Sequence, residues 1–414
     1  MIYNIKNTES IVKGVVHLPT SKSISNRLLI MSALSGDRLI PKELSDSDDT
    51  IVMQKILRSS SLEHNAGHAG TAMRFLTAYF ACKPGEVLLT GSERMKNRPI
   101  GVLVDLLREL GASIEYTGKK GFPPLRITGA KLKGGKRSIN SEVSSQYISA
   151  LLLIAPYLHG GLDLSLKGNM VSASYINLTL QLMKRAGIHY SWNNNNIKIE
   201  EGNYHAGAFH VEPDWSAASY WYEMVALAEE ADIFIPGLTS DSLQGDAALS
   251  SIFESLGVKT VFEENGVSLL KTKPTLDFFE YDFTLSPDLV QTLIPTCVLK
   301  GIAFRFTGTQ TLRIKETDRI LALHNEMRKF GVQLDYTEIG DCIAWDGKSV
   351  FKPRKSVLID TYEDHRMAMG FAPVSLLTKE IRINDPGVVS KSYPGYWKDL
   401  AMTGFLVEHL DAKK

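Results

Sequence analysis

The chain has 414 residues, and its 46 lysine and arginine residues are balanced by 46 aspartate and glutamate residues. This zero net charge argues against a protein that binds nucleic acid or a membrane surface mainly by electrostatic attraction. Hydrophobic residues make up 44% and charged residues 22% of the chain, a composition that is typical of a soluble globular protein and excludes a disordered or fibrous one. The length suffices for about two domains with sizeable cores.

Cysteine usage and the N-terminal segment bear on the compartment. Cys82, Cys297 and Cys342 are far apart and form no C-x-x-C pair, so neither a disulfide framework nor a zinc cluster is indicated. The first residues lack the basic stretch and apolar core of a signal peptide, and the most apolar run, residues 148–158, is too short to cross a bilayer. We therefore expect a cytoplasmic protein without a membrane span.

Helix-like segments that stop at a glycine and continue into a short alternating strand recur along the chain. The glycines are Gly111, Gly187, Gly257 and Gly331, with spacings of 76, 70 and 74 residues. Glycine suits the left-handed conformation at a helix C-terminus, and the apolar alternation after it is typical of a strand. Each unit is thus predicted to be a helix, a glycine stop and a strand.

A second series of helices, more apolar and rich in small residues, has the same period. These helices are predicted to begin at Ser23, Thr71, Ser145, Ser216, Asp288 and His365, and the spacings from Thr71 onward are 74, 71, 72 and 77 residues. Six copies, the first one shorter, predict an assembled α/β array. Coincidental glycine spacing is the alternative, which the agreement between two independent series disfavours.

Six copies divide naturally into two groups of three. Proline and short polar residues interrupt the pattern near Pro19–Thr20 and near Glu212–Pro213. We predict one lobe at residues 20–212 and a second lobe at residues 1–19 and 213–414, with three repeats each and short, hinge-like connections.

Basic and hydroxyl side chains gather where these helices are predicted to begin. A helix N-terminus offers unpaired N–H groups and the positive end of a dipole, so several of them together predict a site for phosphates and carboxylates. In chain order the segments are TSKSISNR with Lys22, Ser23 and Arg27, HAGTAMR with Arg74, MKNRPIG with Arg98, SSQ with Ser144, Ser145 and Gln146, RIKETDR with Lys315 and Arg319, DHRMAM with Arg366, and SKSYP with Lys391.

Two of these segments allow a closer interpretation. Arg74 and Arg366 directly precede apolar helix, where a planar guanidinium suits anion recognition, although an internal salt bridge is the alternative. In RIKETDR, Lys315 and Arg319 are predicted to share a helix face, while Glu316 points elsewhere and serves as a proton carrier. A capping pattern with exposed ion pairs would look similar.

Signatures of several other enzyme classes are missing from the sequence. GGKRS at Gly134 has Arg137 where a Walker loop requires Ser or Thr, and neither G-x-G-x-x-G nor G-x-S-x-G occurs. His64 and His68 are four residues apart without a helical pattern between them, which disfavours a zinc pair.

Six segments, in this order, resemble the 5-enolpyruvylshikimate-3-phosphate synthase family: K-S-x-S-N-R, A-G-T-A-M-R, R-M-K-x-R-P-I, V-S-S-Q, R-x-K-E-T-D-R and D-H-R-M-A-M, with KGNMVSASY and SKSYP in addition. The resemblance covers essentially the whole chain. It implies a two-domain inside-out α/β barrel in which each domain has three βαβαββ repeats with helices inside. It also implies transfer of the enolpyruvyl group of phosphoenolpyruvate to the 5-hydroxyl of 3-phosphoshikimate, with release of phosphate, in the shikimate pathway of aromatic amino acid biosynthesis.

The resemblance also implies substrate contacts. Those of 3-phosphoshikimate are expected at Ser23, Arg27, Ser144, Ser145, Ser172, Tyr175, Asp288 and Lys315. Those of phosphoenolpyruvate are expected at Lys22, Gly70, Arg98, Gln146, Arg319, Arg366 and Lys391, with Arg319 and Arg366 suited to its carboxylate. Asp288, Glu316 and Lys22 are the candidate catalytic residues for proton transfer in an addition–elimination reaction.

Further expectations follow from the same resemblance. Neither a metal nor an organic cofactor is implied. The expected partners are the two small substrates, and neither nucleic acid nor a membrane is expected. We expect the protein to be a monomer. Because the predicted residues are divided between both halves of the chain, we expect catalysis to require closure about the two hinges.

The sequence departs from the family's usual pattern at several positions. His68 stands where Asn is usual before A-G-T-A, and Thr311 and Leu312 replace a usual Asn and an aromatic residue. Thr20 and Phe75 replace a usual Gly and Pro. Protonated His68 would add charge beside a phosphate and make phosphoenolpyruvate affinity pH-dependent, whereas a tolerated replacement is the alternative.

Two other functions compete with this assignment. The sister enolpyruvyl transferase that acts on UDP-N-acetylglucosamine has the same fold and donor but typically uses a loop cysteine, whereas Cys82 lies within or just after an apolar helix. A non-catalytic anion-binding relative is disfavoured because binding alone would not require Lys22, Asp288 and Glu316.

Overall fold

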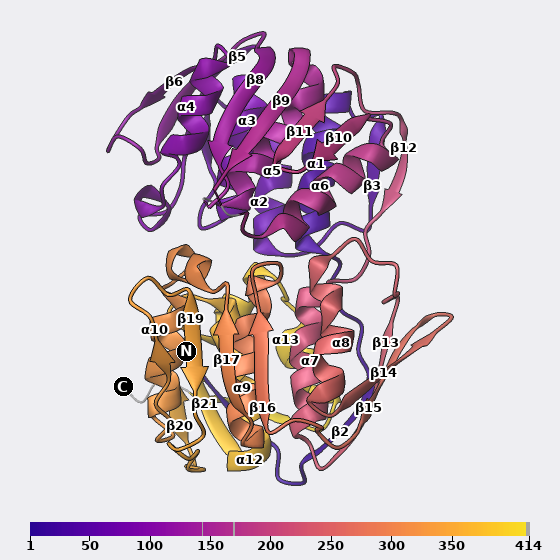
Figure 1. Cartoon of the computed structure of the whole chain (residues 1–414), viewed down its shortest axis with the longest axis vertical. Helices are drawn as coiled ribbons and strands as arrows, with labels where there is room; N and C mark the ends of the chain where they lie inside the picture. Colours follow the sequence, from indigo (N-terminus) through magenta and orange to yellow (C-terminus); the bar gives the residue numbers. More distant parts are fainter. Residues whose placement is uncertain (143, 169, 411–414) are drawn as a thin grey trace. The chain divides into compact units, whose positions relative to one another are not determined.

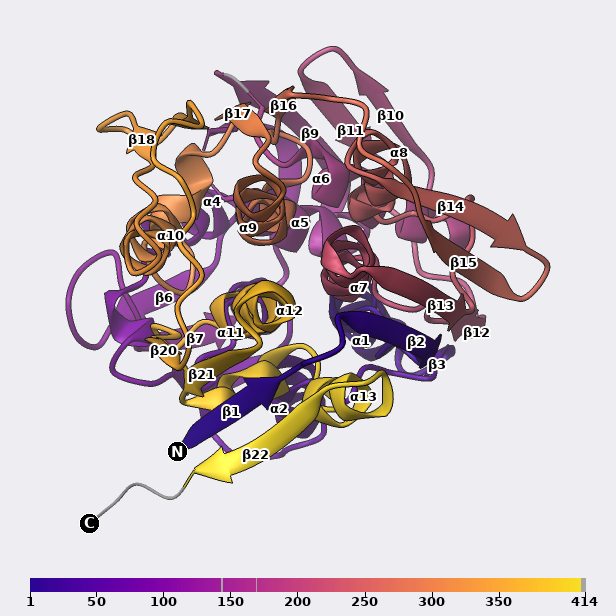
Figure 2. The same cartoon turned by 90° about the horizontal axis from the view of Figure 1, so that it is seen from below.

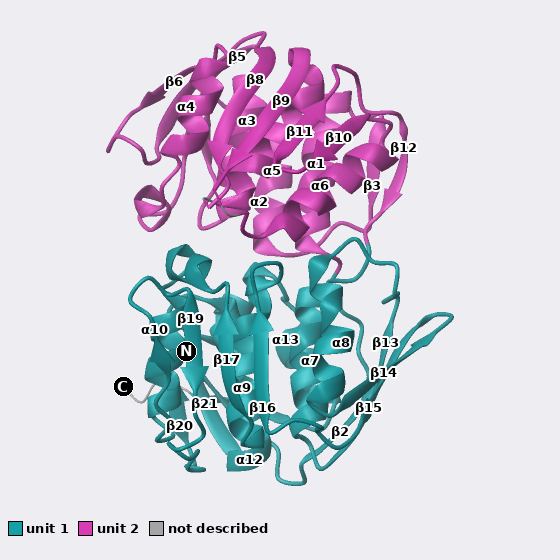
Figure 3. Ribbon diagram, viewed as in Figure 1, with its two compact units in different colours: residues 1–19, 212–414 teal, residues 20–211 magenta. Residues whose placement is uncertain are grey.

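The computed structural model describes residues 1–142, 144–168 and 170–410. Val143 of the V-S-S-Q segment and Asn169 of KGNMVSASY lie outside the described residues. The chain separates into two compact units, which Figure 3 distinguishes by colour: unit 1 is Met1–Pro19 with Glu212–Lys414, and unit 2 is Thr20–Val211. This division differs from the predicted ranges only in the placement of Glu212.

Unit 2 contains six α-helices and three sheets among its described residues (Figure 1). The helices are α1 (Lys22–Ser35), α2 (Asp48–Leu57), α3 (Gly70–Ala81), α4 (Gly101–Glu109), α5 (Ser145–Ile154) and α6 (Ala173–Arg185). In spatial order, the sheets are β4 (Glu63–Asn65), β5 (Gly85–Thr90), β7 (Leu125–Gly129) and β6 (Ser113–Tyr116); β10 (Tyr190–Asn193), β11 (Asn196–Ile199), β9 (His159–Lys167) and β8 (Lys133–Asn140); and β12 (Gly207–His210) with β3 (Leu39–Lys42).

Unit 1 contains seven α-helices and three four-stranded sheets among its described residues. The helices are α7 (Trp215–Leu227), α8 (Leu249–Ser255), α9 (Val290–Lys300), α10 (Arg319–Arg328), α11 (His365–Phe371), α12 (Ser375–Thr378) and α13 (Tyr396–Met402). The sheets are β14 (Val258–Glu263), β15 (Gly266–Lys271), β13 (Glu230–Pro236) and β2 (Ile11–Val15); β16 (Phe278–Asp282), β17 (Ala303–Thr307), β19 (Cys342–Trp345) and β18 (Asp335–Tyr336); and β20 (Val357–Ile359), β21 (Glu380–Asn384), β1 (Ile2–Lys6) and β22 (Leu406–Leu410).

Strand pairing shows that the sheets repeat one design. In each of the five four-stranded sheets, one edge strand pairs in parallel with its neighbour and the other two pairings are antiparallel. The remaining sheet, β12 with β3, keeps only the parallel pair and belongs to the shorter first copy. The predicted α/β fold class is therefore confirmed.

The glycine stops lie where the sequence places them. Gly111, Gly187, Gly257 and Gly331 have φ values of 103°, 84°, 95° and 83°, in the left-handed region. They follow the ends of α4, α6, α8 and α10 and precede β6, β10, β14 and β18. Because a side chain is strained at such φ values, glycine allows the chain to leave the helix and return as a strand.

The innermost helices of unit 1 are buried on all sides. Every residue of α11 is buried, as is every residue of α9 from Val290 to Val298. Figure 2 shows α7, α9 and α11 inside the unit, with strands such as β1, β22, β2 and β13 farther out. A helix with solvent on no face needs no polar stripe for water, and the polar residues of these helices, such as Gln291 and Thr292 on α9, are buried with the apolar ones. No described helix combines the length and the apolar character needed to cross a lipid bilayer.

Glu223 on α7 leads to a prediction about stability. Its side chain is fully buried, and neither carboxylate oxygen has a hydrogen-bond partner among the described residues. Burial raises the pKa of Glu223 well above its ordinary value. A carboxyl that is protonated in the folded state and ionised in the unfolded state makes stability fall as the pH rises above the unfolded-state pKa.

We expect Glu223→Gln to remove this dependence. As the pH rises from about 5 to about 7, the wild type should lose about 1.4 kcal/mol of unfolding free energy per pH unit relative to the variant. Urea unfolding of both proteins at three pH values in that window measures the difference. Parallel pH dependence in the two proteins would contradict the prediction.

Candidate active site

The helices of unit 2 place many of the predicted residues at their N-terminal ends. Helix α1 packs against α3, α5 and α6, and α5 also packs against α3 and α6. The predicted residues at or beside these ends are Lys22 and Ser23 in α1, Gly70 in α3, Ser144, Ser145 and Gln146 at α5, and Ser172 before α6. Free backbone N–H groups at these ends are suited to anionic ligands.

Arg27 is a buried cation on α1 that has only neutral partners among the described residues. Arg27 is 3% exposed, and its Nε donates to Thr179 Oγ1 at 2.7 Å. Nη1 donates to the Ser23 carbonyl at 2.8 Å, and Nη2 donates to the Tyr175 carbonyl at 3.2 Å. Burial lowers the pKa of Arg27 to about 10, so the side chain is still charged at neutral pH. A buried charge without an opposite charge is costly, and an anionic ligand would offset that cost.

Gly70, Arg98 and Gln146 are brought together at the start of α3. A Cβ atom added at Gly70 would lie 2.5 Å from Arg98 Nη1, so only glycine allows the guanidinium this close approach to the helix. Gln146 Nε2 donates to Thr71 Oγ1 at 3.2 Å, which ties the start of α5 to the start of α3. Lys22 contacts α2 instead, where its Nζ lies 3.7 Å from Oδ2 of Asp49.

The contacts of Arg74 point to a positioning role. It donates to the carbonyls of Gly70 at 3.2 Å and Pro99 at 2.9 Å, and its residue is buried. These bonds fasten the segment that carries Arg98 to the start of α3. The interpretation of Arg74 as an anion-binding side chain therefore has less support than a role in holding Arg98.

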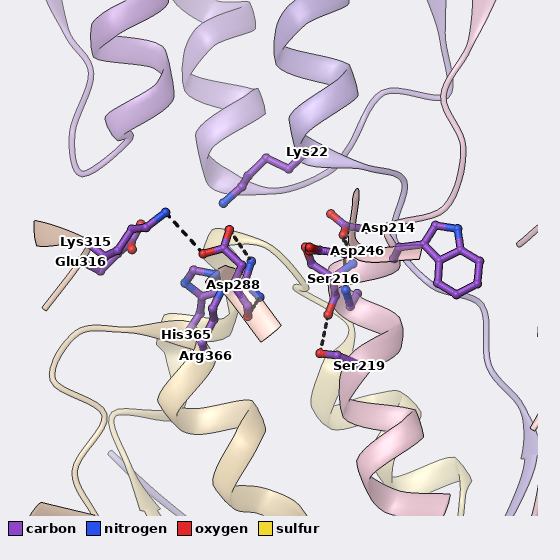
Figure 4. A network of polar contacts seen from close by, with 12 residues as sticks. Lys22, Asp214, Ser216, Ser219, Asp246, Asp288, Lys315, Glu316, His365 and Arg366 are labelled. Carbon is purple, nitrogen blue, oxygen red and sulfur yellow. Dashed lines mark hydrogen bonds and ion pairs between the residues drawn. The ribbon is translucent and has the colours of Figure 1, made fainter. Parts of the chain in front are cut away.

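In unit 1, Asp288 is surrounded by three cationic side chains (Figure 4). Its carboxylate lies 2.9 Å from Arg319 Nη1, 3.3 Å from Arg366 Nη2 and 3.5 Å from Lys315 Nζ. Asp288 is in the short 3₁₀ turn that leads into α9, and Arg366 Nη1 also donates to the Asp288 carbonyl at 3.1 Å. Nearby opposite charge favours the ionised form of a carboxyl group, so Asp288 is an available carboxylate base, although the same cations weaken its hold on a proton.

Arg319, the first residue of α10, joins three carboxylates. Nε lies 2.7 Å from Asp364, Nη2 lies 2.8 Å from Glu316, and Nη1 contacts Asp288. Burial of this residue, which is 1% exposed, disfavours its charge, but the carboxylates of Asp364, Glu316 and Asp288 outweigh burial and raise the pKa of Arg319. The guanidinium is therefore the centre of a buried ionic network.

Glu316 brings a residue distant in sequence into this network. Its Oε1 lies 3.0 Å from Lys391 Nζ while its Oε2 contacts Arg319. The cluster of Asp288, Lys315, Glu316, Arg319, Asp364, Arg366 and Lys391 contains four cationic and three acidic side chains, and we refer to it as the Asp288 cluster. Among these seven side chains the cations outnumber the carboxylates by one, and such a set is suited to bind anions.

The prediction for RIKETDR is wrong in two respects. Helix α10 begins only at Arg319, because Asp318 caps it by accepting a hydrogen bond from Leu321 N at 3.1 Å. Lys315 and Glu316 precede the helix, so Lys315 and Arg319 do not share a helix face. Glu316 does not point elsewhere but contacts Arg319 directly.

Sequence reasoning gave Asp364 no role, and it placed His68 beside a substrate phosphate. Asp364 is fully buried, caps α11 through Arg366 N at 2.9 Å, and binds Arg319. Its acidic position directly before a helix was the available signal, but the same signal indicates an ordinary cap. His68 is exposed, and its Nδ1 lies 3.0 Å from Ser92 Oγ.

Comparison with known proteins gives consistent similarities over nearly the whole chain. Residues 59–400 match the family described as EPSP synthase (3-phosphoshikimate 1-carboxyvinyltransferase). A 3-phosphoshikimate 1-carboxyvinyltransferase of Bacteroides fragilis is 51% identical, over 95% of this chain and 96% of the relative, and that of Vibrio atlanticus is 36% identical, over 94% and 97%. A solved EPSP synthase structure from Acinetobacter baumannii, 22% identical, superposes with a TM-score of 0.80 over 99% of this chain and all of the other, which supports the fold.

Proposed function

The chain belongs to the EPSP synthase (3-phosphoshikimate 1-carboxyvinyltransferase) family, and we propose that it transfers the enolpyruvyl group of phosphoenolpyruvate to the 5-hydroxyl of 3-phosphoshikimate and releases phosphate. This reaction is a step of the shikimate pathway of aromatic amino acid biosynthesis. The observation that carries the proposal is the Asp288 cluster, in which a carboxylate suited to accept a proton lies among cations suited to bind anions.

The charges of the substrates account for the number of cationic residues. Each substrate carries a phosphate and a carboxylate, and their mutual repulsion must be neutralised before they can react. We assign the carboxylate of phosphoenolpyruvate to the planar guanidinium groups of Arg319 and Arg366. The other proposed contacts of phosphoenolpyruvate are Lys22, Gly70, Arg98, Gln146 and Lys391.

The proposed contacts of 3-phosphoshikimate are hydroxyl-rich. They are Ser23, Arg27, Ser144, Ser145, Ser172, Tyr175, Asp288 and Lys315. The burial of Arg27 without an acidic partner among the described residues supports this assignment, since its charge lies beside Ser23 and Tyr175.

The proposed mechanism is addition followed by elimination. The 5-hydroxyl oxygen forms a bond to C2 of phosphoenolpyruvate while C3 gains a proton, which gives a tetrahedral intermediate. The bond from C2 to the phosphate oxygen then breaks and C3 loses a proton, which gives the enolpyruvyl product and phosphate. Asp288 is suited to take the hydroxyl proton, and Glu316 and Lys22 are the candidates for proton transfer at C3.

Phosphate release from phosphoenolpyruvate tests the proposal. Three parallel reactions contain 3-phosphoshikimate, UDP-N-acetylglucosamine or no acceptor, and mass spectrometry identifies the product. We expect release only with 3-phosphoshikimate, together with its enolpyruvyl ether. Release only with the nucleotide sugar would assign the sister activity, and release with neither acceptor would overturn the proposed transfer.

A further inference from the structure

Glu326 on α10 holds the segment that leads from β20 to α11. Its side chain is fully buried. Glu326 Oε1 accepts a hydrogen bond from Tyr362 Oη at 2.7 Å, and Oε2 accepts one from Asp360 N at 3.2 Å. Lys329 Nζ lies 2.7 Å from Glu326 Oε2 and 3.0 Å from Asp360 Oδ2. One buried carboxylate therefore fastens residues 360–362 to α10 at both ends.

The backbone of this segment is unusual. Tyr362 and Glu363 both lie in the left-handed region, with φ values of 53° and 55°. Residues other than glycine are unfavourable there, and two in succession persist only where surrounding contacts hold them in place. The hydrogen bond from Tyr362 to Glu326 is such a contact. Strain of this kind is concentrated at functional sites, and the next residue, Asp364, belongs to the Asp288 cluster.

Asp364 joins the two arginines that we assign to phosphoenolpyruvate. Its Oδ2 lies 2.7 Å from Arg319 Nε, and its Oδ1 accepts a hydrogen bond from Arg366 N at 2.9 Å, at the start of α11. Arg319 and Glu326 are both on α10. The same helix therefore holds the segment at two points, through Asp364 at its end and through Tyr362 two residues earlier.

We propose that Glu326 is a positioning residue for the transfer reaction, and that it acts through Tyr362 and Asp364. This inference rests on the proposed function. The hydrogen bond to Tyr362 keeps Asp364 where it orients the guanidinium of Arg319 and caps the helix that carries Arg366. A guanidinium binds a carboxylate through two parallel hydrogen bonds, so a small displacement of either arginine should weaken the binding of phosphoenolpyruvate.

A purely structural role of Glu326 makes a different prediction. Loss of a buried hydrogen bond lowers stability and with it the fraction of active enzyme, which reduces the apparent kcat but changes neither KM. Displacement of Arg319 and Arg366 instead raises the KM for phosphoenolpyruvate. The proposed contacts of 3-phosphoshikimate include neither arginine, so its KM serves as an internal reference.

Two variants break the contact from opposite sides. Tyr362→Phe removes the hydroxyl that donates to Glu326 and keeps the aromatic ring. Glu326→Gln removes the charge and replaces one of the two accepting oxygens by an amide nitrogen, which cannot accept. Tyr222→Phe is the matched control, because Tyr222 is also buried in unit 1 and its Oη lies 2.8 Å from Thr260 Oγ1, on a strand, β14, that carries no proposed substrate contact.

The measurements are kcat and KM for each substrate at saturation of the other, with thermal unfolding of every variant. We expect Tyr362→Phe to raise the KM for phosphoenolpyruvate by about three- to thirtyfold, part of what a hydrogen bond to a charged group contributes, and to leave the KM for 3-phosphoshikimate near that of the wild type. The double variant should raise the KM for phosphoenolpyruvate by less than the product of the two single effects, because both changes act on one contact. Tyr222→Phe should lower stability and change neither KM.

The outcomes distinguish this inference from the proposed function. Normal wild-type turnover with an unchanged KM for phosphoenolpyruvate in both single variants would overturn the role of Glu326 alone. An equal rise in the KM values of both substrates, or a double variant whose effect equals the product, would overturn it as well. If one single variant does not fold, the KM values of the other decide the question. Absence of wild-type turnover with 3-phosphoshikimate would overturn the proposed function and this inference with it.

Discussion

Asp288→Asn is expected to lower kcat by about 10²- to 10⁴-fold, the range that a well-placed general base contributes. The amide cannot accept the hydroxyl proton, although it preserves the shape of the side chain. Its loss of charge leaves Arg319, Arg366 and Lys315 without the carboxylate that contacts all three. The KM for phosphoenolpyruvate should therefore not rise, since these cations become more available to an anion.

Steady-state phosphate release with both substrates varied measures this separation of kcat from KM. Asp282→Asn is a suitable control, because Asp282 is six residues earlier and the side-chain hydrogen bonds that the described structure gives it go to Thr284. Glu316→Gln should also lower kcat, because Glu316 is a second candidate for proton transfer. Near wild-type turnover in both Asp288→Asn and Glu316→Gln would remove these residues from the mechanism.

The repeat could be predicted from the sequence because its signals are local. A helix that ends at Gly111, Gly187, Gly257 or Gly331 needs a left-handed residue within its own last turn, and the strand that follows has its own alternation. The parallel strand pairs carry no such signal. The pairing of β2 with β13 joins residues more than 200 positions apart, and only the packed unit shows it.

In the candidate site, too, local signals could be predicted from the sequence and long-range contacts could not. The basic residues at the helix starts were visible as a pattern, but their partners were not. Glu316 contacts Lys391, and Arg319 contacts Asp364, across distances in sequence that no spacing rule covers. The predicted start of α10 is too early because Asp318, a side chain within the motif itself, caps the helix, which therefore begins at Arg319.

Arg319→Gln is expected to destabilise unit 1 by about 3–5 kcal/mol, the cost of breaking a buried ionic network by removing one partner. Asp364, which is 0% exposed, would lose its 2.7 Å contact, and Glu316 and Asp288 would lose contacts of 2.8 and 2.9 Å. Uncompensated carboxylates favour protonation, so the deficit should shrink as the pH falls from neutral toward about 4. Urea unfolding at several pH values measures both the deficit and its pH dependence.

The control for Arg319→Gln is Arg305→Gln. Arg305 on β17 forms an ion pair of similar length, 2.9 Å, with Glu280, but the two side chains are 52% and 59% exposed. An exposed pair contributes about 0–1 kcal/mol, so burial rather than pairing should account for the difference between the two variants. Equal losses in both variants would contradict this explanation.

Arg319→Lys separates the structural from the substrate-binding role of Arg319. Lysine retains the positive charge among three carboxylates, so it should recover part of the stability that Arg319→Gln loses. It lacks the planar fork that binds a carboxylate through two parallel hydrogen bonds, so it should not recover the affinity for phosphoenolpyruvate. A lysine variant that restored both properties would show that Arg319 acts in binding only through its charge, and would leave Arg366 as the planar donor for the substrate carboxylate.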